Sequence, residues 1–198
     1  MRYYYFNPFS KQYYFPVDFH TYPVFDTFYQ PYKVTAKLMW RVWKSSRVFR
    51  SLYLTDEPEK VLPLKNITPY ITSGSILAFN LGTVGAEQKI SILGVDRASK
   101  SEFYIKYATT EIACKNVYNE GMVIQQLSLM PFVPKLEMCV QEEHKFTLIK
   151  TSVLKGKKVI NQSLDQKLLK IMFSLSTQQV KSLRKYDSNL QSSFAHGD

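Results

Sequence analysis

The last residues of the chain carry side chains suited to catalysis. His196, Gly197 and Asp198 follow Phe194 and Ala195, which places an imidazole and a carboxylate after a short apolar approach. A carboxylate held in such a loop can accept the proton of an attacking hydroxyl group. Two interpretations follow: the tripeptide is the catalytic base of a larger enzyme that is cut at this point, or it is a coincidental tail.

A second charged residue with chemical potential lies inside a predicted strand. Lys106 has apolar and aromatic neighbours on both sides in Phe103–Tyr107. A charge inside a half-buried strand is costly unless an opposite charge pairs with it. Glu120, in the helix predicted next along the chain, could be that partner. The alternative is an edge-strand lysine whose ammonium group lies in water.

Alternation and helical periodicity define the elements that would position these residues. Period-two patterns separated by short polar turns predict an antiparallel meander, and the apolar face of the following segment predicts a helix that ends before Pro131 and Pro134. The predicted elements are strands at 75–81, 89–95 and 102–108, a helix at 111–129, strands at 136–140 and 146–149, and helices at 164–175 and 177–185. This mixed order predicts an α+β fold.

A glycine-containing turn joins the first two of these strands. Gly82, Thr83 and Gly85 lie in it, and Lys89 follows directly. Backbone N–H groups in such a turn can face phosphate oxygens. An ordinary hairpin turn explains the same residues equally well.

These stretches together resemble the aminoglycoside-phosphotransferase-like branch of the protein-kinase superfamily. The resemblance covers residues 75–198 and is carried by the glycine turn, the Lys106 strand, the Asn119-Glu120 helix running into Val133-Pro134, the Leu154-Lys155-Gly156 linker and His196-Gly197-Asp198. It implies a kinase-like small lobe, a five-stranded antiparallel sheet plus one helix, followed by the first helices of an incomplete large lobe.

The resemblance also implies roles for individual residues. Lys106 would contact the α- and β-phosphates of ATP, Glu120 would orient Lys106, and Gly82, Thr83 and Gly85 would cover the phosphates. Asp198 would orient or deprotonate a hydroxyl-bearing acceptor, and His196 would brace the loop. Main chain near Thr147–Thr151 would grip adenine. The family's Mg²⁺ ligands follow the catalytic Asp, so we expect a truncated, inactive part of a small-molecule phosphotransferase, and no metal ligands here.

The first 72 residues lie outside this resemblance. Residues 1–31 are rich in Tyr, Phe and Pro, which predicts an extended, irregular segment wrapped over another surface. Residues 33–53 predict a basic amphipathic helix. Such a helix could lie on anionic lipid, or it could be a solvated helix covering a domain. The expected domains are therefore 1–72, a nucleotide-binding lobe at 73–151, and 152–198.

Composition limits the classes of partner. The chain has 198 residues, a net charge of +10 and 15% aromatic residues, which is compatible with a globular protein and an anionic partner. The basic residues are spread along the chain without a nucleic-acid motif, which argues against nucleic acid. Cys114 and Cys139 match no metal or disulfide spacing. We expect a cytoplasmic protein, with the inner membrane face as its peripheral contact. The alternative function is a non-catalytic binding module for a membrane or protein partner.

Overall fold

A computed structural model describes residues 2–7, 12–31, 33–55, 62–142 and 145–154. The predicted helices at 164–175 and 177–185, together with His196 and Asp198, lie outside the described residues. Contacts divide the chain into two units at Lys155, so the description below concerns the first unit alone.

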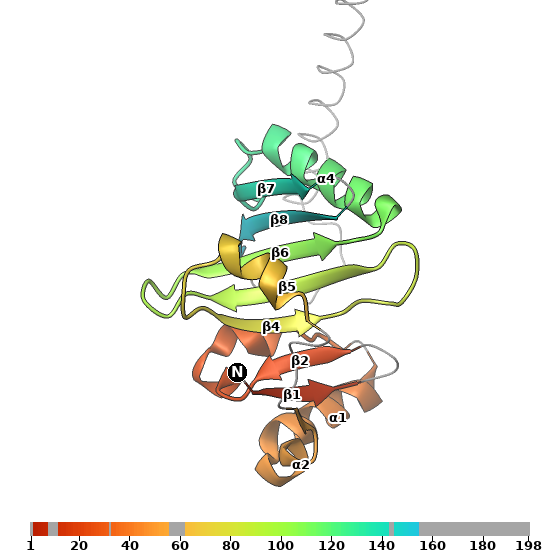
Figure 1. Ribbon diagram of the computed structural model, residues 1–198. Coiled ribbons are helices and arrows are strands. Elements are labelled where there is room, and N and C mark those ends of the chain that lie inside the picture. Colours follow the sequence, from red (N-terminus) through yellow and green to blue (C-terminus); the bar gives the residue numbers. More distant parts are fainter. Residues whose placement is uncertain (1, 8–11, 32, 56–61, 143–144, 155–198) are drawn as a thin grey trace, which may run out of the picture. The chain divides into compact units, whose positions relative to one another are not determined.

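One antiparallel sheet of eight strands forms the centre of this unit (Figure 1). The strand order is β3-β1-β2-β4-β5-β6-β8-β7. The strands are β1 (Tyr3–Phe6), β2 (Tyr13–Pro16), β3 (Leu54–Thr55), β4 (Ile76–Asn80), β5 (Lys89–Val95), β6 (Glu102–Ala108), β7 (Leu136–Glu142) and β8 (Phe146–Ser152). The five strands predicted between residues 75 and 149 thus correspond to β4–β8, and their bounds differ by at most a few residues.

The prediction of a kinase-like small lobe with a five-stranded sheet is wrong. The sheet does not end at β4, because β2 pairs with it through Tyr13↔Asn80 and Tyr14↔Phe79. β1 and β3 then extend the sheet further. Pro16 is compatible with this arrangement, because it stands at the end of β2, beyond Tyr13 and Tyr14, which pair with β4.

Short helices cover parts of the sheet. They are the 3₁₀ helices η1 (Phe19–Thr21), η2 (Pro23–Thr27) and η4 (Thr68–Tyr70) and the α-helices α1 (Val34–Ser45), α2 (Arg47–Ser51), α3 (Leu64–Ile67) and α4 (Glu111–Gln126). The single helix expected at 33–53 is divided, because Ser46 adopts an extended conformation and its hydroxyl accepts a hydrogen bond from the N–H of Phe49 at 3.1 Å. Ser46 is therefore an N-cap that begins a second helix.

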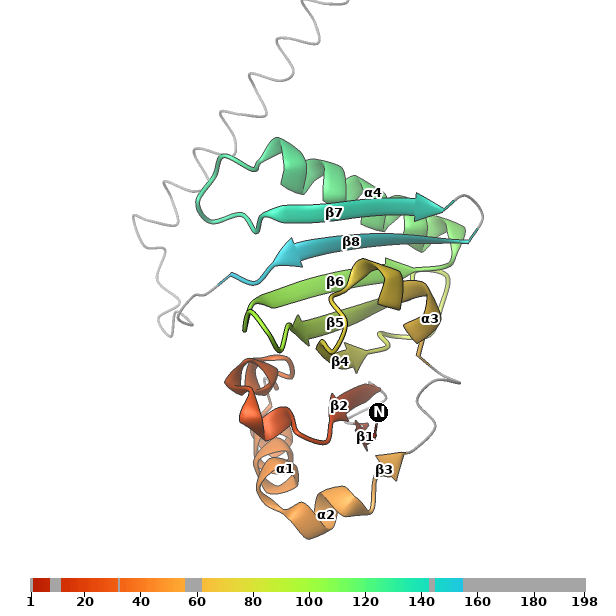
Figure 2. The ribbon, with the colours of Figure 1, turned by 60° about the vertical axis from the view of Figure 1, so that its left-hand side comes forward.

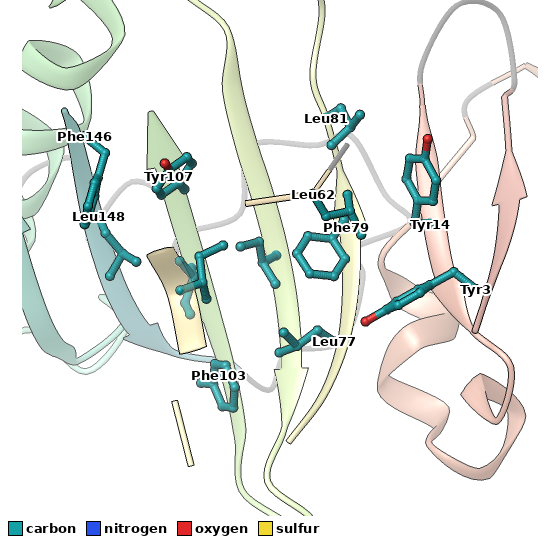
Figure 3. Packing of buried hydrophobic residues seen from close by; sticks show 13 residues of the cluster. Tyr3, Tyr14, Leu62, Leu77, Phe79, Leu81, Phe103, Tyr107, Phe146 and Leu148 are labelled. Atoms are coloured by element: carbon teal, nitrogen blue, oxygen red, sulfur yellow. The ribbon is translucent and has the colours of Figure 1, made fainter. Parts of the chain in front are cut away.

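The first face of the sheet is covered by the segment that contains α3 and η4 (Figure 2). Leu62 and Ile67 of this segment are buried against alternate residues of the strands, among them Leu77, Phe79 and Ile105. Figure 3 shows Tyr3 and Tyr14 from the N-terminal strands pointing into the same space as Leu77 and Phe79. One continuous core thus joins β1 and β2 to β4, β5, β6 and β8.

The second face carries an aromatic cluster at one end and α4 at the other. Phe6 and Phe15 pack against Trp40 and Trp43 of α1. The rings of the two tryptophans stack, with their centroids 5.3 Å apart. At the other end, Val117 of α4 packs near Ile149 of β8. Gly121 permits this close approach, because a Cβ there would lie 2.9 Å from Cγ2 of Ile149. Among the described residues, no helix is both long enough and apolar enough to cross a bilayer.

Candidate functional site

Lys106 lies in the middle of the sheet, on the second face. Its strand, β6, runs between β5 and β8, with Ser91 and Ile149 as its register partners. Side chains alternate along a strand, so Lys106 shares its face with Tyr104, and the buried Ile105 points to the other face. Lys106 thus emerges between the aromatic cluster and α4, where its ammonium group keeps partial access to solvent.

Glu120 of α4 forms an ion pair with Lys106, from Oε1 to Nζ. Thr110 begins this helix: its hydroxyl accepts a hydrogen bond from the N–H of Ala113, and Ala113 and Val117 on the inner side are buried. Packing of that inner side holds Glu120 over the sheet. The two side chains retain 29% and 33% of their exposure, so the pair is neither sealed in the core nor fully solvated.

A cavity of about 150 Å³ opens beside this ion pair. It lies between α4 and the sheet and is lined by Tyr104, Lys106, Glu120, Ile124, Pro134, Ile149 and Thr151. Ligand pockets generally measure about 300–1,000 Å³. The cavity is therefore large enough for part of a ligand, and its wall combines one charged pair with apolar side chains and the hydroxyl-bearing Tyr104 and Thr151.

The glycine turn between β4 and β5 forms a second, more open hollow of about 520 Å³, lined by Gly82–Lys89 and including Thr83 and Gly85. Several hydrogen bonds hold the turn, among them one from the N–H of Gln88 to the carbonyl of Gly85 at 3.0 Å. The N–H of Gly82 donates to Oδ1 of Asn80 at 3.0 Å, Nε2 of Gln88 donates to the carbonyl of Leu81 at 2.9 Å, and the hydroxyl of Thr110 donates to the carbonyl of Ala86. The same threonine thus begins α4 and fastens the turn.

Lys89 lines the hollow of the glycine turn and also lies near Lys106 on the sheet. It is the register partner of Ala108, while Lys106 is the partner of Ser91, so the two lysines are diagonal neighbours on one face. Diagonal positions of this kind lie roughly 7–8 Å apart. Both side chains are partly exposed. An anion on this face would therefore meet two positive charges, of which Lys106 has a carboxylate partner.

We expect the turn to require glycine at position 82. Gly82 has φ +69°, and a Cβ there would lie 2.5 Å from the carbonyl oxygen of Lys89, whereas Gly74 has φ +82° with no atom within 4 Å. Gly74→Ala should therefore lower the free energy of unfolding by about 1 kcal/mol, because alanine disfavours the left-handed conformation. Gly82→Ala should lower it by about twice as much, because the Cβ also meets the carbonyl oxygen. Urea unfolding of both variants would measure the difference. Equal losses would contradict a close contact between the turn and Lys89.

The remaining predicted site residues do not all join this face. Residues Thr147–Thr151 of β8 pair with β6 on one side and with β7 on the other, so their main chain is occupied by the sheet ladders. Main-chain contacts to a ligand would have to come from beyond this paired stretch. His196 and Asp198 lie outside the described residues. Thr110 was not identified from the sequence as part of this site, although a Thr directly before a helix that begins with an acidic residue is an N-cap signature.

The two cysteines lie on either side of the contact between α4 and the sheet. Both are free and partly buried. The thiol of Cys114 donates to the carbonyl of Ala108 at 3.3 Å, and burial raises the pKa of the Cys139 thiol. Within the ranges that the structure describes, no three His, Cys, Asp or Glu side chains are grouped so that they could hold a metal ion.

Comparisons with known proteins do not assign the chain to a family. No protein-family model matches it, no curated protein is significantly similar, and no solved structure matches its fold.

Proposed function

We propose that the face of the sheet around Lys106 binds the phosphates of ATP, as the nucleotide-binding part of a phosphotransferase that acts on a hydroxyl-bearing small molecule. The observation that carries this proposal is the Lys106–Glu120 ion pair, held at the wall of a cavity by a central strand and a packed helix. A charged pair in such a position is costly to bury and adds little as a surface bridge, which favours a role in binding.

The chemistry of the face suits a polyphosphate. A lysine is a compact positive charge that pairs with phosphate oxygens, and Glu120 fixes the direction in which Lys106 points. Lys89 adds a second positive charge to the same face and also lines the hollow of the glycine turn. Phosphoryl transfer depends largely on such positioning and on charge neutralisation.

The remaining parts of the reaction are assigned to groups outside this face. ATP supplies the phosphoryl group, and Mg²⁺ would neutralise part of the charge on its phosphates. Asp198 is proposed to accept the proton of the acceptor hydroxyl, and His196 to brace the loop that holds it. In this scheme Lys106 is the principal contact between the described face and the nucleotide, and Lys89 adds a second positive charge.

Replacement of Lys106 tests the proposal directly. We expect Lys106→Met to weaken ATP binding about tenfold or more, since a hydrogen bond to a charged group contributes about 1.5–3 kcal/mol. The full-length chain would be titrated with ATP in a calorimeter. Circular dichroism would show whether each variant remains folded.

Lys150→Met is the matched control. Lys150 lies on the neighbouring strand β8 and pairs with Glu137 at 3.1 Å, but its ammonium group stands 4.7 Å from the ring centroid of Phe103, on the first face. Both replacements remove one positive charge from a strand lysine with a glutamate partner. If both variants lost ATP affinity equally, or if wild-type protein did not bind ATP, the proposal would be abandoned.

A further inference from the structure

The outer side of α1 and α2 exposes large apolar side chains. Val34, Leu38 and Val42 recur every four residues on α1 and are 79%, 61% and 50% exposed. Val48 and Leu52, on α2 and at its end, are 76% and 73% exposed. Residues spaced by four lie on one side of a helix. α1 therefore presents an apolar stripe to its surroundings, and α2 adds two protruding side chains.

Basic residues accompany this apolar surface. Lys33, Lys37, Arg41 and Arg47 are exposed, and no described residue forms an ion pair with any of them. The sequence contains no acidic residue from Thr27 to Thr55. On the helical wheel, Lys37 and Arg41 lie next to the stripe of Val34, Leu38 and Val42. The surface thus combines apolar contact area with basic side chains that form no ion pair with the residues that the structure describes.

The inner side of these helices fixes the surface in place. Ala36, Trp40 and Trp43 of α1 are buried, and the two tryptophans belong to the aromatic cluster. The guanidinium of Arg50 on α2 donates to the carbonyls of Trp43 and Lys44 and lies 5.6 Å and 5.7 Å from the ring centroids of Tyr4 and Phe19. Arg50 therefore ties α2 to α1 and to the sheet. The exposed side is preformed and need not fold when it binds.

We propose that the outer side of α1 and α2 docks on the surface of an anionic lipid bilayer. Apolar side chains on a helix with neighbouring Lys and Arg suit the headgroup boundary, where the chains enter and the charges meet anionic lipids. A protein partner is less suited, because charged residues are depleted at the core of protein interfaces, whereas here they stand next to the apolar stripe. A second copy of the chain would bring the same positive charges together. The proposal does not depend on nucleotide binding.

Vesicle flotation tests this proposal with the full-length chain. Wild type should bind phosphatidylcholine vesicles that contain phosphatidylserine and should bind vesicles of phosphatidylcholine alone much less. The double variant L38Q/V42Q should lose about tenfold or more in partitioning, because two exposed apolar side chains no longer enter the boundary. The matched control is I112Q/V123Q on α4, which alters two side chains that are each 51% exposed.

A second arm isolates the electrostatic contribution. K37Q/R41Q should lower partitioning on anionic vesicles by on the order of tenfold, and raising the salt concentration should have the same effect on wild type. Equal binding to both kinds of vesicle, or equal losses in L38Q/V42Q and I112Q/V123Q, would overturn the proposal. A different result would also overturn it: wild type does not bind vesicles but self-associates in sedimentation experiments, and L38Q/V42Q abolishes this self-association. The surface would then join two copies of the chain.

Discussion

Raising the pH from about 10 to about 12 is expected to destabilise the protein by several kcal/mol, because buried tyrosines resist ionisation in the folded state. Burial, together with the smaller effects of the neighbouring Tyr29 and Tyr104, raises the pKa of Tyr13 from 10.0 to about 12. Burial is also the main cause that raises the pKa of Tyr3, Tyr14, Tyr29 and Tyr107. All five rings have little exposed surface.

The sign follows from proton binding. Below pH 10 the folded and unfolded chains both carry neutral phenols, so the stabilisation is fully present. Above pH 10 the unfolded chain releases these protons, while Tyr13 in the folded chain keeps its proton until about pH 12. The free energy of unfolding therefore falls across this window, and Tyr13 alone accounts for on the order of 2–3 kcal/mol.

Circular dichroism and tyrosinate absorbance, recorded together against pH, would measure this effect. Tyrosinate formation and loss of structure should coincide for the buried rings. Lysines also titrate in this range, so Tyr13→Phe provides the comparison: removal of this phenol should move the alkaline midpoint upward. Tyr53→Phe, at an exposed ring, is the control. Ionisation of the five rings in protein that remains fully folded would refute the prediction.

Trp43→Ala is expected to cost about 3–5 kcal/mol, a large part of the stability of a typical domain. The Trp43 side chain is 1% exposed and stands at the centre of the aromatic cluster. Its ring centroid lies 4.7 Å from that of Phe6, 5.6 Å from Phe15 and 5.3 Å from Trp40. Alanine would leave a cavity between α1 and the sheet that these rings can fill only in part.

Denaturant unfolding of three variants would check this expectation. Trp43→Phe should cost much less than Trp43→Ala, because it keeps an aromatic ring and removes an indole N–H that has no hydrogen-bond partner among the described residues. Leu38→Ala, at an exposed position of the same helix, should change stability by about 0.5 kcal/mol or less. A similar small loss for Trp43→Ala would show that α1 does not contribute to the core.

Alternation in the sequence was sufficient to locate β5 and β6 but not β1 and β2. In β6 every second side chain enters one core, and this period is visible in the sequence. In β1 both faces are buried: Tyr3 enters the core on the first face, and Tyr4 and Phe6 enter the aromatic cluster on the second. A strand buried on both faces has no alternation to detect, so Tyr3–Phe6 resembles any apolar run.

The Lys106–Glu120 contact could be anticipated, because a charged residue between apolar neighbours needs a partner and the next helix offers a carboxylate. The number of strands in the sheet could not be predicted in this way. β2 and β4 are distant in the sequence, so no hairpin turn sets the register of their pairing. The glycine turn was visible as a turn, but its hydrogen bond to Thr110 depends on where α4 begins.

The pairing of β2 with β4 has a consequence for synthesis of the protein. Ribosomes add roughly 5–20 residues per second, so β4 emerges several seconds after β2. A hairpin of two strands is at best marginally stable in water, and β1 and β2 acquire their inner neighbour only when β4 arrives. During that interval the aromatic side chains of β1 and β2 are expected to be exposed, and exposed apolar surface of this kind is what chaperones bind.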